Sequence, residues 1–236
     1  MRSLLAISSV AALALQPDPA VLRGIFEDGL ARKQEQYGVF DARTAQAARD
    51  LGMFLARHGE QKDARNILDQ VVRIDEKVFG AAAPQTLADV AELADLTSTP
   101  QAEALWKRAA EAADAAIAAR AFAALGKLHA LSDDRRGAAS YYRRAIVKQE
   151  AATGKSSAAV ALDLNVLAKL VDSVEAVPLF ERALAIDRQT FGSKHAETAT
   201  TAANLAGLLA DTPRNAEAIR LATLEQVPQV IANQRE

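Results

Sequence analysis

The sequence predicts an all-α protein built as an array of helical hairpins. Half of the 236 residues are apolar, and alanine, the best helix former, dominates among them. Runs of valine and isoleucine with the two-residue period of a strand are absent from the sequence. A 14-residue sequence pattern, the repeated phrase, also recurs along the chain without gaps, at intervals of about 40 residues or about twice that. Recurrence at intervals of about 20–50 residues is typical of repeat arrays.

The clearest copy of this phrase occupies residues 179–192, and degraded copies begin at Ile67, Tyr141 and Ile25. Each copy ends in glycine, and the glycine spacings are 80 − 38 = 42, 154 − 80 = 74 and 192 − 154 = 38. The middle interval has room for two units, one of them eroded. Since each unit of such an array packs on its neighbours, the pattern predicts an extended surface rather than a single deep pocket.

The first predicted element is a secretory signal peptide at residues 1–14. Arg2 supplies a positive charge, an apolar stretch follows, and Ala12-Leu13-Ala14 fits the small-x-small cleavage pattern. The alternative is a buried first helix that packs on the half-repeat downstream. The segment is too short for a convincing membrane span. We therefore expect a periplasmic or secreted protein, with no membrane span after cleavage behind Ala14.

Residues 15–40 should hold an N-terminal capping helix, because residues 19–38 align only with the second helix of a hairpin. Terminal units of a repeat array need a cap that covers their apolar face. The repeat domain is expected to span residues 41–225, and a polar C-terminal tail follows at residues 226–236.

Within the repeat domain, a small residue after leucine marks the first helix of each of about five hairpins. These small residues are Gly52, Ala94, Gly126, Ala168 and Ala206. The second helices carry a column of alanine, at Ala64, Ala102, Ala138, Ala176 and Ala218. Four residues later, on the same helix face, stand Leu68, Trp106, Tyr142, Phe180 and Ala222. The columns lie 12 residues apart in hairpins one, three and five but 8 apart in two and four, so those two should lack about one helical turn.

These columns resemble the tetratricopeptide repeat, over roughly residues 20–225. The turn with Phe191-Gly192, His195 and Thr198 that leads to Asn204-Leu205-Ala206 is similar to the kinesin-light-chain type, whose units have about 42 residues. The resemblance implies a tetratricopeptide-type α-solenoid, a right-handed superhelix of helical hairpins. It also implies protein binding but names no partner, because this repeat serves many unrelated partners.

The turns between hairpins have simple structural interpretations. A glycine follows each second helix, where a left-handed C-terminal cap is expected, at Gly38, Gly80, Gly154 and Gly192. Asp41 and Ser157 fall at N-cap positions of the next helix, and Pro84 suits a first helical turn.

Composition and motifs give no support to catalysis, to a metal or other cofactor, or to nucleic-acid binding. The net charge is −2, cysteine is absent, and none of the three histidines has a second ligand at helical spacing. His129 replaces a tyrosine usual in the repeat and should pack in the core, whereas His195 should cap or order its turn. Gly154-Lys155-Ser156 lacks the upstream glycine of a phosphate-binding loop.

The first helix of each hairpin lines the concave face of a tetratricopeptide array. The residues predicted to bind a peptide there are Arg49, Met53, Arg120, Lys127, Asn165 and Lys169. Their basic side chains suit an extended peptide with acidic residues, and Asn165 suits its backbone amides. The alternative is an ordinary solvated face. The lysine–asparagine pair of a carboxylate clamp is missing at Arg49 and Met53, so a chaperone C-terminus is not expected.

The leading hypothesis is a non-enzymatic scaffold that holds a peptide or protein in a concave helical groove. The charge of that groove favours a partner with acidic residues. The second hypothesis is an accessory or catalytic envelope protein with a site between repeats, which a deep pocket lined by acidic residues and His129 would favour. The third is self-association into a homo-oligomer, because the repeats at both ends are incomplete.

Overall fold

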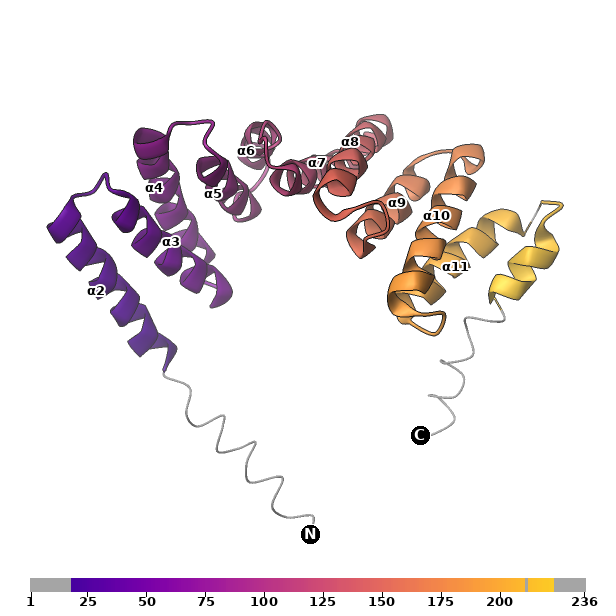
Figure 1. Cartoon of the computed structure of the whole chain (residues 1–236), viewed down its shortest axis with the longest axis horizontal. Helices are drawn as coiled ribbons and strands as arrows, with labels where there is room; N and C mark the ends of the chain where they lie inside the picture. Colours follow the sequence, from indigo (N-terminus) through magenta and orange to yellow (C-terminus); the bar gives the residue numbers. More distant parts are fainter. Residues whose placement is uncertain (1–17, 211, 223–236) are drawn as a thin grey trace, which may run out of the picture. The chain divides into compact units, whose positions relative to one another are not determined.

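A computed structural model describes residues 18–210 and 212–222 of the chain (Figure 1). These residues form helices joined by turns, with no strand among them, which confirms the predicted all-α class. The predicted signal peptide and the predicted C-terminal tail lie outside the described residues. None of the helices in the described part is long and apolar enough to cross a membrane.

The chain divides into two compact units, residues 1–102 and residues 103–236. The first unit holds α2 (Pro19–Tyr37), α3 (Ala42–Arg57), α4 (Gln61–Phe79), α5 (Pro84–Asp95) and the start of α6 (Gln101–Ala109). Each of α2, α3 and α4 packs against the next helix along the chain. The rings of Phe26 on α2 and Phe54 on α3 lie 5.1 Å apart, so α2 covers the exposed side of the first hairpin (Figure 1).

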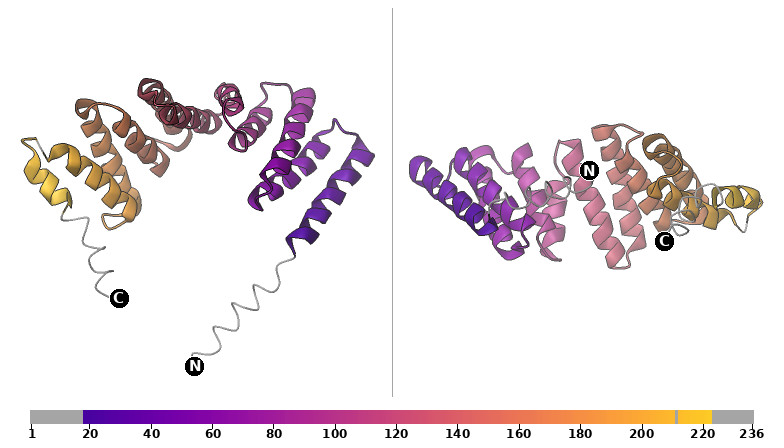
Figure 2. Two further views of the ribbon diagram at one scale, coloured as in Figure 1. Left: turned by 180° about the vertical axis from the view of Figure 1, so that it is seen from behind. Right: turned by 90° about the horizontal axis from the view of Figure 1, so that it is seen from below.

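The second unit holds the rest of α6 and four longer helices. These are α7 (Ala115–Leu131), α8 (Arg135–Thr153), α9 (Ala158–Leu170) and α10 (Ser173–Phe191), and they are followed by α11 (Ala196–Leu209) and a helical segment at residues 215–222. In this unit α8 packs on both α7 and α9, and α10 packs on both α9 and α11 (Figure 2). The hairpins of the second unit therefore stack in sequence order, as the repeat predicts.

Small residues of the predicted columns lie where two helices of a hairpin approach closely. A Cβ atom added to Gly126 would lie 2.7 Å from the ring of Tyr142, and one added to Gly52 would lie 3.0 Å from Leu68. The alanines of the second column are buried as well, with Ala64 and Ala138 wholly shielded from solvent. The interlocking of the two columns is therefore confirmed in both units.

The turns between hairpins share one hydrogen bond. Thr44, Thr86 and Thr198 each donate from the hydroxyl to the carbonyl of the glycine six residues earlier, at 2.8–2.9 Å. The turn that carries the resemblance includes one of these three threonines, Thr198. Pro84 begins α5, and Asp41 and Ser157 cap α3 and α9, as predicted.

The glycines at these turns do end their helices, but the predicted left-handed helical cap is wrong. Their φ angles lie between 85° and 97°, whereas their ψ angles lie between 155° and 169°. This combination leads the chain straight away from the helix, and it is accessible essentially to glycine alone. The turn therefore needs glycine more strictly than a left-handed cap would.

The lengths of the first four hairpins alternate as predicted, whereas α11, the first helix of the fifth hairpin that was predicted to be long, has only 14 residues. The first helices α5 and α9 have 12 and 13 residues, whereas α3 and α7 have 16 and 17. The difference is about one helical turn. In the hairpin of α9 and α10, the missing helical turn lies at the end of α9, next to the short turn of Val171 and Asp172.

Candidate binding site

Two of the six residues predicted to bind a peptide lie on α3 in the first unit. Arg49 donates from Nε and Nη2 to the two carboxylate oxygens of Asp89, both at 2.6 Å, and from Nη2 to Asp75 Oδ2 at 2.9 Å. Its Nη1 donates to Gln46 Oε1 at 2.8 Å. Met53 lies one turn later and is half-buried. Arg49 thus has an internal role, and its contact with a peptide stays a prediction.

We call Arg49, Asp75 and Asp89 the Arg49 junction, because they join α3, α4 and α5. Asp75 is fully buried and Asp89 is 2% exposed. Burial, together with the neighbouring Asp89 carboxyl, raises the pKa of Asp75, and the hydrogen bonds to Asp89 raise the pKa of Arg49. The planar guanidinium binds Asp89 through two parallel hydrogen bonds, which is the geometry that distinguishes arginine from lysine.

The other four predicted residues lie in the second unit. Arg120 and Lys127 lie two turns apart on α7, whereas Asn165 and Lys169 lie one turn apart on α9. The guanidinium of Arg120 lies 5.6 Å from the ring centroid of Trp106. Exposed residues on the first helices of this unit form what we call the first-helix face: Arg120, Lys127, Leu162, Lys169, Ala203 and Gly207, with Asn165 half-buried among them.

Asn165 takes the position in its hairpin that Arg49 takes in the first unit. Its Nδ2 donates to Thr201 Oγ1 at 2.8 Å, and the Thr201 hydroxyl donates to Asp187 Oδ2 at 2.6 Å. Asp187 and Thr201 are buried, with 3% and 1% of their surface exposed. Asn165 Oδ1 is also buried and has no hydrogen-bond partner within the described residues. These three residues, the Asn165 junction, join α9, α10 and α11.

A hollow with a volume of about 260 Å³ opens beside the Asn165 junction. The residues that line it are Ala158, Ala159, Leu162, Asn165, Asp187, Phe191 and Glu197. The ring of Phe191 stacks on His195, with centroids 4.7 Å apart. His195 is the N-cap of α11 and accepts a hydrogen bond from the Glu197 amide at 3.2 Å, so the predicted ordering of this turn is confirmed. This turn therefore fixes the positions of Phe191 and Glu197, which both line the hollow.

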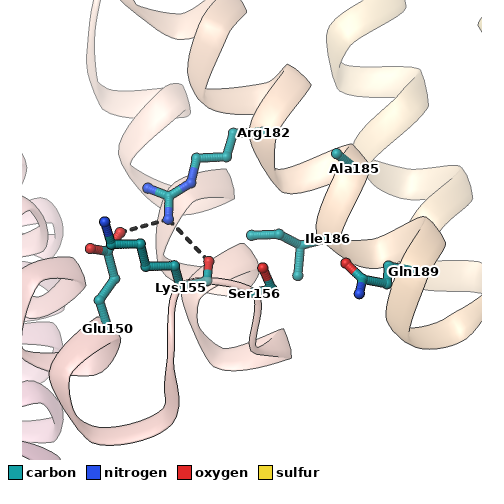
Figure 3. Close-up of a pocket in the computed structure, with 7 residues that line it drawn as sticks. All are labelled: Glu150, Lys155, Ser156, Arg182, Ala185, Ile186 and Gln189. Atoms are coloured by element: carbon teal, nitrogen blue, oxygen red, sulfur yellow. Dashed lines mark hydrogen bonds and ion pairs between the residues drawn. The ribbon is translucent and has the colours of Figure 1, made fainter.

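A larger hollow, of about 450 Å³, lies on the second helices α8 and α10 (Figure 3). Arg182 donates to Glu150 Oε1 at 2.6 Å and to the carbonyl of Lys155 at 3.0 Å, as Figure 3 shows. Ser156 and Gln189 complete its polar lining. Because its arginine and its carboxylate already bind each other, this hollow offers a ligand less than the hollow beside Asn165.

The prediction that His129 packs in the core is confirmed in part, because its ring lies 4.9 Å from the Tyr141 ring and its Nε2 is buried. Its side chain is 25% exposed, its Nδ1 lies 2.7 Å from Asp134 Oδ2, and its Nε2 lies 3.9 Å from Glu103. Asp134 caps α8. The imidazole of His129, at the end of α7, binds this carboxylate in the turn, which the longer side chain of the usual tyrosine would not do. Neither hollow above contains His129. The described residues include no group of three side chains suited to a metal ion.

Sequence reasoning found the positions of Arg49 and Asn165 but missed their acidic partners. Asp75 and Asp187 both follow isoleucine in the repeated phrase, four residues before its phenylalanine. An acid that recurs beside a buried isoleucine was the available signal, because a charged side chain at that place needs a partner. Thr201 carried no comparable signal.

Two segments of the chain, residues 44–84 and residues 165–223, match family models described as tetratricopeptide repeat. The crystal structure of BtubC (BKLC) from P. vanneervenii is similar, with a TM-score of 0.69, 16% identity, and coverage of 92% of this chain and 93% of that chain. The crystal structure of MamA protein has a TM-score of 0.60, 15% identity, and coverage of 83% and 97%. At these identities both structures show the fold alone. No curated protein sequence matches the chain.

Proposed function

Because the chain is a tetratricopeptide repeat protein, we propose that it is a non-enzymatic scaffold that holds an extended segment of a protein partner. Tetratricopeptide repeats generally serve as protein–protein interaction scaffolds, since stacked hairpins present long surfaces rather than deep pockets. The observation that carries the proposal is the first-helix face, where successive first helices of the second unit expose small and basic side chains.

Charge on this face supports a partner with acidic residues. Lys127 and Lys169 each follow the small residue of their hairpin, and both are exposed. Lysine amines at such places attract carboxylates over about 10 Å at moderate salt. On α11, Ala203 and Gly207 leave room for a backbone to approach, and an added Cβ at Gly207 would meet nothing within 4 Å.

Capture of partners from an envelope extract tests this proposal. The bait is the chain from Leu15 onward, and the K127E/K169E variant reverses both charges on the first-helix face. Since each exposed ion pair contributes about 0.2–1 kcal/mol, we expect capture to weaken about tenfold. The control variant is K155E/K194E, which makes the same charge change at exposed positions in the turns after α8 and α10.

The control should retain the partner. A partner retained equally by both variants would place the interface elsewhere and contradict binding on the first-helix face. Failure to capture any protein, together with a mass that rises with concentration, would replace the scaffold with self-association.

We also propose that the protein is exported, to the periplasm or beyond the cell. The support is the amino-acid pattern of residues 1–14 alone, with its single positive charge, apolar stretch and small-x-small ending. Cell fractionation followed by mass spectrometry of the N-terminus tests it. We expect an envelope or secreted chain that begins at Leu15, and an intact N-terminus in the cytoplasm would overturn the proposal.

A further inference from the structure

The Arg49 junction and the Asn165 junction correspond residue by residue. Arg49 and Asn165 both stand three residues before the small residue of a first helix. Asp75 and Asp187 both stand four residues before the phenylalanine that ends a second helix. Asp89 and Thr201 both stand three residues after the threonine that bonds the turn glycine. The repeat thus builds the same place twice, with different side chains.

In the first unit this place is occupied by a guanidinium. The Arg49 side chain reaches from α3 and donates three hydrogen bonds, at 2.6–2.9 Å, to the carboxylates of Asp75 and Asp89. Three quarters of the Arg49 side chain is shielded from solvent in this position. The geometry of the repeat at this place therefore accommodates an arginine side chain between neighbouring hairpins.

In the second unit the shorter Asn165 leaves the corresponding space open. Two carboxylates, those of Asp187 and Glu197, line the hollow of about 260 Å³, and none of its seven lining residues is basic. Asn165 Oδ1 is a buried acceptor that no donor of the described residues satisfies. Buried acceptors of this kind cost free energy until a donor reaches them. The hollow therefore has the charge and the hydrogen-bonding capacity that Arg49 satisfies in the first unit.

We propose that this hollow binds an arginine side chain of the partner, with the guanidinium held by Asp187, Glu197 and Asn165 Oδ1. The origin of the arginine in a partner rests on the proposed function, whereas its binding does not. Five N–H donors in a planar fork match acceptors that come from three helices. The half-exposed ring of Phe191 and the exposed Leu162 offer apolar surface to the methylene stem and the flat cation.

The size of the hollow agrees with a single side chain. Sites for drug-sized molecules measure about 300–1,000 Å³, so about 260 Å³ is small for such a ligand. An arginine that enters from solvent would bring a positive charge to a hollow whose seven lining residues include two acids and no basic side chain. It would also complete the hydrogen bonding of Asn165.

The direct test uses the whole chain and a minimal probe, N-acetyl-arginine methylamide, in an NMR titration. We expect saturable shifts confined to α9, α10 and α11, with a dissociation constant on the order of 1 mM, as for a ligand of this size. The neutral isostere N-acetyl-citrulline methylamide should bind at least tenfold more weakly. Equal binding of the two probes, or shifts elsewhere in the chain, would overturn the proposal.

Variants locate the probe. Asn165→Arg places the arginine of the first unit in the hollow, and we expect at least tenfold weaker probe binding with the thermal unfolding midpoint retained. Glu197→Gln, at an exposed position, should weaken the probe about threefold because it removes one of two carboxylates. Glu111→Gln removes an exposed acid of the same unit away from the hollow and should change nothing.

If Asn165→Arg fails to fold, the comparison of Glu197→Gln with Glu111→Gln decides alone, and equal effects would count against the hollow. Failure of the proposal is distinguishable from failure of the proposed function. A captured partner with no probe binding removes only the arginine site, whereas probe binding with no captured partner removes only the scaffold.

Discussion

The Arg49 junction and the Asn165 junction hold a buried acid at the same place in the repeat, but they surround it differently. In the first unit, a cation from the chain itself lies between two acids. In the second, a threonine hydroxyl donates to the acid, and an amide oxygen stays unpaired beside a hollow. The difference teaches that the repeat fixes where polar side chains gather, whereas three substitutable residues decide whether that place is closed or open.

A third place in the second unit extends the comparison. Asp163 on α9 occupies the position of Asp89 and Thr201, but Ala123 stands where Arg49 and Asn165 stand in theirs. Asp163 is 8% exposed, and burial raises its pKa to about 6. Burial and this nearby acid raise the pKa of Tyr142 in turn. Here the acid is buried with neither a cation nor a hydroxyl assigned to it among the described residues.

Removal of the internal cation should have the largest effect. Arg49→Ala leaves two buried carboxylates, and breaking a buried ion pair costs about 3–5 kcal/mol. Because a quarter of the Arg49 side chain is exposed, we expect the low end, about 3 kcal/mol, in the free energy of unfolding measured with urea. A loss below about 1 kcal/mol, as for a surface pair, would break the comparison.

The matched variant for Arg49→Ala converts one junction into the other. The double variant R49N/D89T gives the first unit the three side chains of the Asn165 junction, Asn, Asp and Thr. We expect it to be more stable than Arg49→Ala, because Asp75 regains a hydroxyl donor. If the changes in unfolding free energy of the single variants R49N and D89T add up to that of the double variant, the two residues do not act as one unit.

Asp163 gives the next largest effect, and it depends on pH. Its pKa is about 6 in the folded chain against 3.8 for the free group, so the folded state holds the proton more tightly. Stability contributed by this group is therefore lost as the pH rises from about 4 to about 6, and the full penalty remains above that range. Asp163→Asn should raise the free energy of unfolding by about 2 kcal/mol at pH 7 and change it little at pH 4.

Asp89→Asn is the opposite case, because Asp89 has a cation partner. It should destabilise the chain at pH 7, where Asp163→Asn stabilises it. Urea unfolding of both variants at the two pH values gives the comparison, and the same sign for both at pH 7 would refute the distinction between the two acids.

Thr201→Val should have a smaller effect than Arg49→Ala. The change keeps the shape of the side chain but removes the hydroxyl that bridges Asn165 and Asp187. Loss of a buried hydrogen bond to a charged acceptor costs about 1.5 kcal/mol. Urea unfolding measures this loss, and Thr200→Val on the exposed side of α11 serves as the control. An equal loss of unfolding free energy in Thr201→Val and Thr200→Val would show that the Asn165 junction is not the cause of the loss.

The smallest effect is expected at Gly207, on the first-helix face near Thr201. An added Cβ meets nothing there, so Gly207→Ala should stabilise α11 by about 0.5–1 kcal/mol through helix propensity. Gly126→Ala on α7 should destabilise instead, because the added Cβ would lie 2.7 Å from the Tyr142 ring. Thermal unfolding of both variants checks the signs, and destabilisation by Gly207→Ala would show that this face is packed.

Much of the fold could be predicted because the same residue pattern recurs in the corresponding helices of several repeats. The small residues at Gly52 and Gly126, the turn glycines and the shortened α5 and α9 all follow from local spacing. The conformation of the turn glycines could not be predicted, because positive φ is common to both possible caps and only ψ separates them.

The candidate site was predicted only in part, for a different reason. Spacing placed Arg49 and Asn165 on the correct helices, but the partners of a long side chain lie on two other helices, 26 and 40 residues further along the chain for Arg49. Whether a basic residue faces a partner protein or a buried acid depends on those distant residues. For His129 the missed partner is close in sequence, because Asp134, five residues later, binds the imidazole while a quarter of the side chain stays exposed.

Hairpin length and junction chemistry are independent features of this chain. Arg49 and Asp75 are 75 − 49 = 26 residues apart and bind each other directly. Asn165 and Asp187 are 187 − 165 = 22 apart and are joined through the Thr201 hydroxyl. The missing turn of α9 lies at the opposite end of the hairpin, beside Val171 and Asp172. A helical turn can therefore be lost at one end of a hairpin while the junction at the other end keeps its hydrogen bonds.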